Sequence, residues 1–290
     1  MLALERMREL TLQIILRVVF GARDDELTAL RRAIDDTLAT VRSLPSLLAM
    51  AVVRKDLGPQ SPWGRFRVAV ERFDAILFEL LARRRERTGE DDSMLAVLLD
   101  QRDEHGNPPS DRNLRDQLVA LLVGGHDESA ASLAWAFERL ARYPEVQARL
   151  GEGDPAYLDA VVKEALRLRP VIPGVGRVVR GEPFRLGDYV IPPGVEINPS
   201  IRMIHGRADL YPEPTRFRPE RFLGPDAPDT YTWLPFGGGV RRCLGASFAQ
   251  TEMRIVLRRV LQRTALRPAS PKYDKTRSEG SRWRPRTGSA

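Results

Sequence analysis

The only cysteine of this 290-residue sequence, Cys243, lies where glycine and arginine are concentrated. Residues 236–245 read FGGGVRRCLG. Glycines allow the backbone to turn tightly and to come close to a flat or bulky partner. Adjacent arginines, and the N-terminus of a helix expected over residues 247–263, favour the thiolate form of a cysteine. A lone cysteine is often a small buried hydrophobic residue, but these neighbours indicate a metal ligand or a nucleophile.

The overall composition is that of a globular protein with a hydrophobic core, since 42% of the residues are apolar and 29% are charged. A single cysteine excludes a disulfide framework and any all-cysteine zinc or iron–sulfur site. The apolar stretch at residues 10–20 is interrupted by Gln13 and Arg17, so we expect no membrane span. Charged residues at positions 5–9 do not fit a signal peptide. We therefore expect a cytoplasmic protein, and a monomer.

The net charge of +7 comes almost entirely from arginine. A nucleic-acid-binding protein would interleave a basic stripe with exposed aromatic residues, and the sequence has no such stripe. We expect no nucleic-acid partner. The sequence does not exclude a basic face that binds an acidic protein partner.

The spacing of apolar residues predicts a mainly α-helical protein with a small β-sheet region. Helices are expected at residues 3–20, in two stretches within 27–48, and at 65–85, 94–101, 110–143, 144–150 and 154–169. Strands are expected at 175–179, 184–186, 189–191 and 195–197, with a hairpin turn at Gly187 and Asp188. Residues 206–235 should form an ordered, irregular meander, and the polar end from residue 268 an exposed loop and hairpin.

The helix expected at residues 110–143 would be about 45–50 Å long at about 1.5 Å per residue. Its middle reads GGHDES, residues 124–129. Two glycines inside a helix cost about 1 kcal/mol each relative to alanine. Either another element packs closely against Gly124 and Gly125, or a ligand reaches the backbone in a groove lined by Asp127, Glu128 and Ser129. The residues alone favour neither explanation.

Four motifs stand out along this sequence. They are Phe236-x-x-Gly239-x-Arg241-x-Cys243-x-Gly245, Glu164-x-x-Arg167, Pro219-Glu220-Arg221-Phe222 and the stretch GGHD at residues 124–127. Together they resemble the cytochrome P450 family. The first matches that family's haem-binding loop at every defining position, and the second matches the paired residues on the helix before the sheet. The third resembles the meander segment whose arginine completes a Glu–Arg–Arg network, and the fourth the groove motif of the long central helix. The resemblance covers essentially the whole chain and implies one P450-like haem domain over residues 1–290.

The resemblance implies haem b (iron protoporphyrin IX) as cofactor, with Cys243 as the axial ligand of the haem iron. A thiolate in that position pushes electron density towards bound dioxygen and favours O–O cleavage. Gly237, Gly239 and Gly245 would let backbone amides approach the sulfur, and Phe236 would exclude water from it.

Arginines and one glutamate have implied roles around this loop. Arg241 and Arg177 would pair with the haem propionates, because arginine binds carboxylates in a bidentate fork. Glu164, Arg167 and Arg221 would be a structural network that holds one geometry.

The implied activity is that of a haem-thiolate monooxygenase. It would insert one atom of dioxygen into an apolar small organic molecule, with electrons from a separate ferredoxin- or flavin-type donor. The family usually has a threonine after the acid of the central helix, where this sequence has Glu128 followed by Ser129. We expect Asp127 and Glu128 to relay protons, with Ser129 beside them.

Two alternatives remain at this point. Without the threonine, the protein could use peroxides or rearrange its substrate. The chain could also be an inactive haem-binding remnant, because family members usually carry a further stretch before the helix at residues 3–20. On this expectation the fold is N-terminally truncated and lacks helices and outer strands of the family fold.

Overall fold

The computed structural model describes residues 3–22, 24–42, 57–86, 91–270, 276–279 and 282–285. The chain divides into two compact units. One unit is Leu10–His126, and the other combines Met1–Glu9 with Asp127–Ala290. Helices α1 (Ala3–Val18) and α6 (Asp111–Arg142) each contribute residues to both units.

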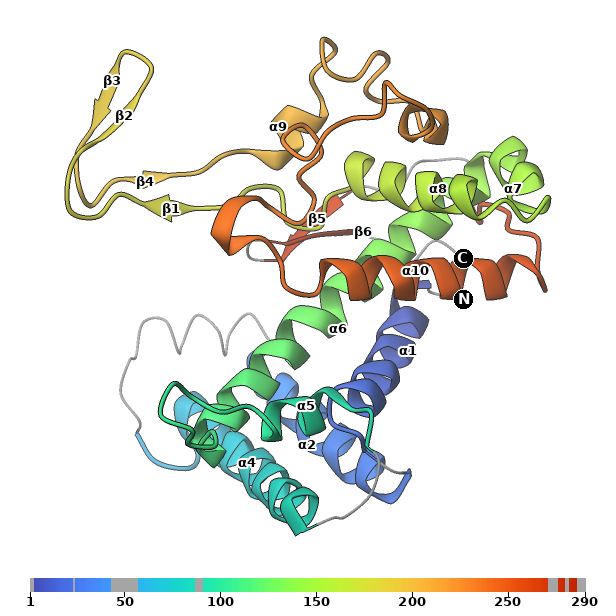
Figure 1. Cartoon of the computed structure of the whole chain (residues 1–290). Helices are drawn as coiled ribbons and strands as arrows, with labels where there is room; N and C mark the ends of the chain where they lie inside the picture. Colours follow the sequence, from blue (N-terminus) through green and yellow to red (C-terminus); the bar gives the residue numbers. More distant parts are fainter. Residues whose placement is uncertain are drawn as a thin grey trace. The chain divides into compact units, whose positions relative to one another are not determined.

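The unit Leu10–His126 is an all-helical bundle. It contains the later part of α1, α2 (Asp24–Arg42), α4 (Pro62–Glu86), α5 (Met94–Leu99) and the first half of α6 (Figure 1). Its core includes aliphatic and phenylalanine side chains at helical spacing: Leu12, Ile15, Leu16, Phe20, Leu30, Phe73, Leu77, Leu81, Leu95, Leu114 and Leu118. Helix α1 ends where Gly21 adopts a φ of 60°, as its sequence predicts.

The buried guanidinium of Arg84 ties three segments of this bundle together. It donates to the carbonyl oxygen of Gly21 at 2.5 Å and pairs with Glu26 at 2.8 Å. Asp91 lies 3.7 Å away on the other side. The charge is therefore compensated inside the unit.

The larger unit is built on the second half of α6, which is buried on every side from Ser129 to Ala141. Around it lie α7 (Pro144–Leu150), α8 (Pro155–Leu168) and α10 (Ala246–Leu261), and α8 and α10 lie side by side (Figure 1). Asp154 caps α8, and its carboxylate accepts the N–H of Ala156 at 2.8 Å. Most residues of this half of α6 are apolar, which suits a helix in a core, and its buried Glu138 is ion-paired with Arg139 and Arg142.

The strands of this unit form small antiparallel ladders. β1 (Arg177–Val178) pairs with β4 (Glu196–Ile197), and β2 (Phe184–Leu186) pairs with β3 (Tyr189–Ile191). The β2–β3 turn is Gly187 and Asp188, with Gly187 at a φ of 57°, so the predicted hairpin is confirmed. β5 (Thr276–Glu279) and β6 (Arg282–Pro285) form the hairpin expected near the end of the chain.

The irregular run at residues 206–235 is ordered by its aromatic residues, as predicted. Tyr211, Phe217 and Phe222 are buried, and the rings of Phe222 and Trp233 meet edge-on at 5.9 Å. Three short helices lie along this part of the chain. α9 (Ile201–His205) precedes the run, η1 (Pro219–Phe222) lies within it and η2 (Gly239–Arg241) follows it. Packed aromatic surface replaces regular hydrogen bonding as the source of order here.

Two local expectations need comment. Helix α2 covers Asp24–Arg42 without an interrupting glycine or proline, so the first of the two stretches expected within residues 27–48 is helical; residues 43–48 lie outside the described part, and the second stretch stays a prediction. Helix α9 has five residues, too few for a periodic signal, and was not predicted.

The expectation of one haem domain over residues 1–290 stays a prediction. In the described part of the chain, no helix combines the length and apolar character that crossing a bilayer requires.

Candidate functional site

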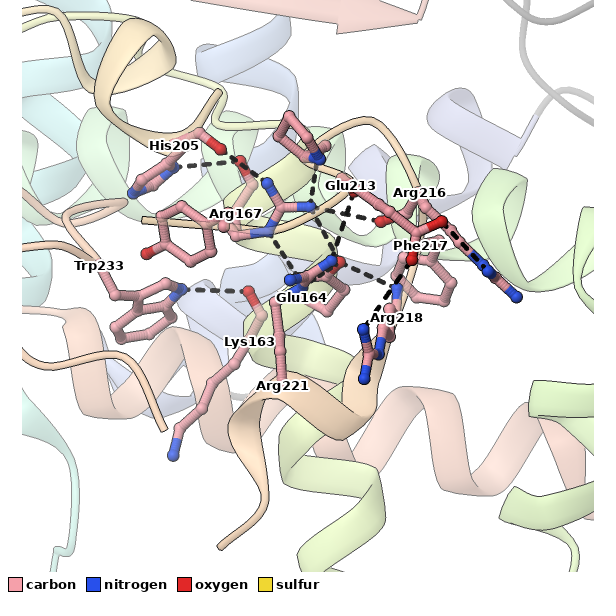
Figure 2. Close-up of polar contacts among 12 residues, drawn as sticks. Lys163, Glu164, Arg167, His205, Glu213, Arg216, Phe217, Arg218, Arg221 and Trp233 are labelled. Atoms are coloured by element: carbon pink, nitrogen blue, oxygen red, sulfur yellow. Dashed lines mark hydrogen bonds and ion pairs between the residues drawn. The ribbon is translucent and has the colours of Figure 1, made fainter. Parts of the chain in front are cut away.

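A buried ion-pair network links α8 to the irregular run. Glu164 is 0% exposed and Arg167 is 1% exposed, and they stand one helical turn apart. Arg167 binds Glu164 in a bidentate pair, with Nε to Oε2 at 2.6 Å and Nη2 to Oε1 at 2.9 Å. Glu164 Oε1 also accepts from Arg221 Nε at 3.1 Å and from the backbone N–H of Arg218 at 2.9 Å (Figure 2).

The remaining donors of Arg167 go to backbone carbonyls at the end of α9 and in the irregular run. Nη1 donates to His205 at 2.7 Å and Nη2 to Pro214 at 2.9 Å (Figure 2). A buried charge is tolerated when it is both paired and hydrogen-bonded. The network therefore holds residues 205–221 in one position against α8.

The same network continues towards the cysteine loop through His205 and Trp233. The His205 ring lies 3.0 Å from the carbonyl oxygen of Arg167 through Nδ1, and 2.9 Å from the backbone nitrogen of Leu234 through Nε2. Burial lowers the pKa of His205 to about 4. Trp233 Nε1 donates to the carbonyl oxygen of Lys163 at 3.1 Å (Figure 2), and its ring meets Phe236 edge-on at 6.0 Å.

Residues 236–245 form a tight loop that leaves the Cys243 side chain exposed. Gly237 and Gly239 have φ values of 68° and 67°, a left-handed conformation that favours glycine. The N–H of Cys243 donates to the carbonyl oxygen of Phe236 at 2.9 Å, which closes the loop. α10 begins directly after Gly245, so the cysteine precedes a helix N-terminus.

Gly245 differs from these two glycines. Its φ is −81°, and a methyl group there would lie 4.0 Å from the Cys243 sulfur, which is ordinary van der Waals contact. Neither the backbone conformation nor the neighbouring atoms of the protein therefore require glycine at position 245.

The residues around the loop fit a haem group bound by thiolate. Val240 and Leu244 expose apolar side chains on either side of the cysteine, and a methyl group added at Gly239 would meet nothing within 4 Å. Among the described residues, neither Arg241 nor Arg177 has an ion pair with a carboxylate. A methyl group added at Gly237 would lie 3.7 Å from Val175 Cγ1, so the loop is next to the segment that carries Arg177. A soft sulfur ligand, an apolar surface and two cations without protein carboxylates match the chemistry of iron protoporphyrin.

The acidic residues of the central helix have separate surroundings. Asp127 is ion-paired with Arg8, with Oδ1 3.0 Å from Nε. Glu128 is half-buried and Ser129 is buried. Neither carboxylate oxygen of Glu252, on α10, makes a hydrogen bond to a described residue. Burial raises the pKa of Glu252 to about 7, and the nearby Ser129 hydroxyl opposes that rise.

The two glycines of the central helix serve different purposes. A methyl group at Gly125 would lie 2.5 Å from Ile15 Cδ1, so α1 packs directly against the helix there. At Gly124 an added methyl group would meet nothing within 4 Å. Close packing explains Gly125, and open space at Gly124 is compatible with a groove.

Comparison with known families shows which family the chain belongs to. Residues 3–153 and 154–287 match the family described as Cytochrome P450. The chain belongs to the cytochrome P450 family. Over 275 residues it is 44% identical to "Putative cytochrome P450 135B1" of Mycobacterium tuberculosis, covering 90% of this chain and 57% of that protein. It is also 38% identical to "Putative cytochrome P450 138" of the same species, over 98% of this chain and 65% of that protein.

Solved P450 structures show the same fold. A retinoic acid-bound cyanobacterial CYP120A1 superposes with a TM-score of 0.82 at 24% identity, over 99% of this chain and 67% of that one. A cytochrome P450 named CYP102L1 superposes with a TM-score of 0.80 at 26% identity, over 98% and 70%. The fold is thus the expected mainly helical P450 fold, and the chain spans 57–65% of the length of the two mycobacterial relatives.

Sequence reasoning overlooked three residues that the P450 fold brings to this region. His205 ends the five-residue helix α9 and Trp233 lies in the irregular run, and in neither place does an apolar period mark the buried side. Glu252 carried a usable signal, because it stands four residues before the buried Val256 on the apolar face of α10. A carboxylate at such a position indicates a buried titratable group.

Proposed function

We propose that this P450 chain is a haem-thiolate monooxygenase that inserts one oxygen atom into an apolar small organic molecule. Its electrons would come from a separate ferredoxin- or flavin-type donor. One observation carries the proposal: the sole cysteine is exposed on a loop shaped by two left-handed glycines and closed by the Cys243–Phe236 hydrogen bond. A packing role does not need an exposed thiol in a rigid glycine turn.

Bound haem b would supply the activation of dioxygen, and electron donation from a thiolate ligand favours that chemistry. Cys243 is the proposed axial ligand. Backbone amides of the glycine turn would point at the sulfur and moderate its basicity, while Phe236 would exclude water. Arg241 and Arg177 would hold the propionates, since neither is engaged with a carboxylate among the described residues.

Proton delivery is proposed for the acidic residues of α6. Asp127 and Glu128 would move protons, with Ser129 as a hydroxyl on the same helix. The Arg8 ion pair holds the Asp127 carboxylate in one orientation. These roles follow from their position beside the groove motif and are tested below.

Thiolate ligation is tested by the absorption spectrum of the reduced carbon monoxide complex after purification with added haem. A strongly red-shifted Soret band is expected for the native chain, and Cys243→Ser should abolish it. Ser247→Ala, an exposed serine at the start of α10, is the matched control and should keep the band. Absence of haem uptake by the native chain would remove both enzymatic interpretations and leave an inactive remnant.

A second function is favoured by one observation, the glutamate at position 128 where the family usually has threonine. In that case the protein would use peroxide directly or rearrange its substrate. Turnover with reductant and dioxygen should be compared with turnover with peroxide alone. Product from peroxide only would favour the second function over the monooxygenase.

A further inference from the structure

His205 connects two parts of the P450 fold that are far apart in sequence. Its ring is 2% exposed and lies between α8 and the chain that leads into the cysteine loop. One nitrogen is 3.0 Å from the carbonyl oxygen of Arg167, and the other is 2.9 Å from the backbone nitrogen of Leu234. Both of its ring nitrogens are therefore used, each by a different segment.

The two contacts determine which nitrogen carries the proton. The backbone N–H of Leu234 donates, so Nε2 must accept and carry no hydrogen. A carbonyl oxygen only accepts, so Nδ1 must carry the hydrogen that is donated to Arg167. A single neutral tautomer satisfies both contacts, and a doubly protonated ring would lose the Leu234 contact.

The bridge is held in place at its other end. Arg167 Nη1 donates to the carbonyl oxygen of His205 at 2.7 Å, so the two residues exchange hydrogen bonds through side chain and backbone. The His205 ring also meets the ring of Tyr211 edge-on at 6.0 Å. These contacts leave the imidazole little freedom to follow a moving Leu234.

From Leu234 a short path of backbone bonds reaches the cysteine. The carbonyl oxygen of Leu234 accepts the N–H of Gly237 at 3.0 Å, which forms the turn where Gly237 takes its positive φ. The carbonyl oxygen of Phe236, inside that turn, accepts the N–H of Cys243 at 2.9 Å. Whatever fixes Leu234 therefore fixes the point from which the cysteine loop extends.

We propose that His205 is a positioning residue for the thiolate loop, a neutral bridge that fixes the backbone of Leu234 against Arg167 so that Cys243 is presented in one orientation. The part of this inference that concerns haem rests on the proposed function. The part that concerns the loop backbone does not, because every hydrogen bond in the bridge joins two protein groups.

Two substitutions separate the two ends of the bridge. In His205→Asn the side-chain amide can take the place of Nδ1 and donate to Arg167, but it does not reach Leu234. In His205→Gln the longer amide can take the place of Nε2 and accept from Leu234. His105→Gln is the matched control, since His105 is exposed in a loop of the other unit.

The first measurement is amide hydrogen exchange at Leu234 and across residues 234–243 in the haem-free 290-residue chain. We expect His205→Asn to accelerate exchange at Leu234 about ten-fold or more, since one hydrogen bond is lost. His205→Gln and His105→Gln should stay close to the native rate. Equal acceleration in the Asn and Gln variants, or none in either, would overturn the bridge.

The second measurement is the Soret band of the reduced carbon monoxide complex in the haem-loaded variants. His205→Asn should lose part of the thiolate-type band, and His205→Gln should retain it. A fold-destabilising effect without a positioning role would lower haem content and leave the band position of the bound fraction unchanged, and that result would refute the proposal.

The native chain supplies a test that needs no variant. Nitrogen NMR of the imidazole should show hydrogen on Nδ1 and none on Nε2, and the opposite tautomer would refute the bridge even if His205→Asn does not fold. Failure of native haem uptake would instead contradict the proposed function, while the exchange and NMR results would still decide the bridge.

Discussion

Glu164 and Arg221 form a 3.1 Å ion pair although 57 residues separate them in sequence. The same carboxylate is bound by Arg167, so one buried negative charge is shared by two guanidinium groups. Removal of the carboxylate would leave the fully buried Arg167 without a counter-charge. We therefore expect the removal of one member to lower the free energy of unfolding strongly, although the intact network adds little net stability.

Glu164→Gln should lower the free energy of unfolding by about 3–5 kcal/mol, the usual cost of breaking a buried pair. Urea denaturation followed by circular dichroism measures the change. Arg221→Ala should cost less, because the bidentate Glu164–Arg167 pair survives.

Arg207→Ala is the control for this network, since its ion pair with Asp209 is exposed. That substitution should have no measurable effect on unfolding. A Glu164→Gln effect no larger than the Arg207→Ala effect would contradict the buried network.

Gly125→Ala should destabilise the chain because the new methyl group meets Ile15 Cδ1 at 2.5 Å in a packed core. A gain of about 1 kcal/mol in helix propensity opposes an overpacking cost of about 1–3 kcal/mol. Adding Ile15→Val removes the clashing methyl group and should recover most of the loss, as a double-mutant cycle measures.

Gly124→Ala is the matched variant one position earlier on α6, where there is open space. It should stabilise the chain by about 1 kcal/mol in thermal or chemical unfolding. If Gly125→Ala behaves in the same way, close packing of α1 does not explain the second glycine.

Glu252→Gln should change how stability depends on pH. The pKa of Glu252 rises from its ordinary 4.5 to about 7 through burial, so the folded state holds this proton more tightly than the unfolded state. The tighter proton binding stabilises the folded state fully below pH 4.5, and this stabilisation is lost as the pH rises through 7. At about 1.4 kcal/mol per pKa unit, the loss in the free energy of unfolding is about 3 kcal/mol.

The Gln variant should therefore be more stable than the native chain at pH 8 and show a flatter stability profile between pH 4.5 and 8. Denaturant midpoints measured across this range test the expectation. Glu145→Gln, an exposed substitution on α7, has the same change in charge and should leave the native profile in place. A native-like slope in Glu252→Gln would show that another group titrates.

Asp127→Asn and Glu128→Gln should each reduce product formed per electron consumed and increase released hydrogen peroxide. A positioned acid–base group contributes at least about a hundred-fold, so a comparable loss of turnover is expected if these residues form the relay. Asp116→Asn, an exposed acid on the same helix, is the control. Native coupling in both relay variants would assign proton delivery elsewhere.

Local signals in the sequence were sufficient for most of the helices and strands and for the glycine turn before Cys243. Apolar spacing marks α1, α4 and α8 because one face of each is buried, and Gly21 marks a helix end because its backbone is left-handed there. Gly237 and Gly239 are informative for the same reason. Such signals depend on neighbours within a few residues and can be read without a fold.

The hydrogen-bond partners of buried polar groups cannot be predicted from such local signals. The sequence pairs Glu164 with Arg167 by helical spacing, but His205 and Leu234 stand 29 residues apart with no period between them. Whether a glycine serves packing or a groove depends on what lies opposite, as Gly125 and Gly124 show.

By itself, then, the sequence determined the helical class, the order of the main helices and the glycine turn before Cys243. Only the tertiary structure shows that neither Glu252 carboxylate oxygen has a hydrogen-bond partner among the described residues, and that His205 bridges Arg167 to the loop. The physical reason is that hydrogen bonding and desolvation depend on distances in space, which chain-local patterns do not encode.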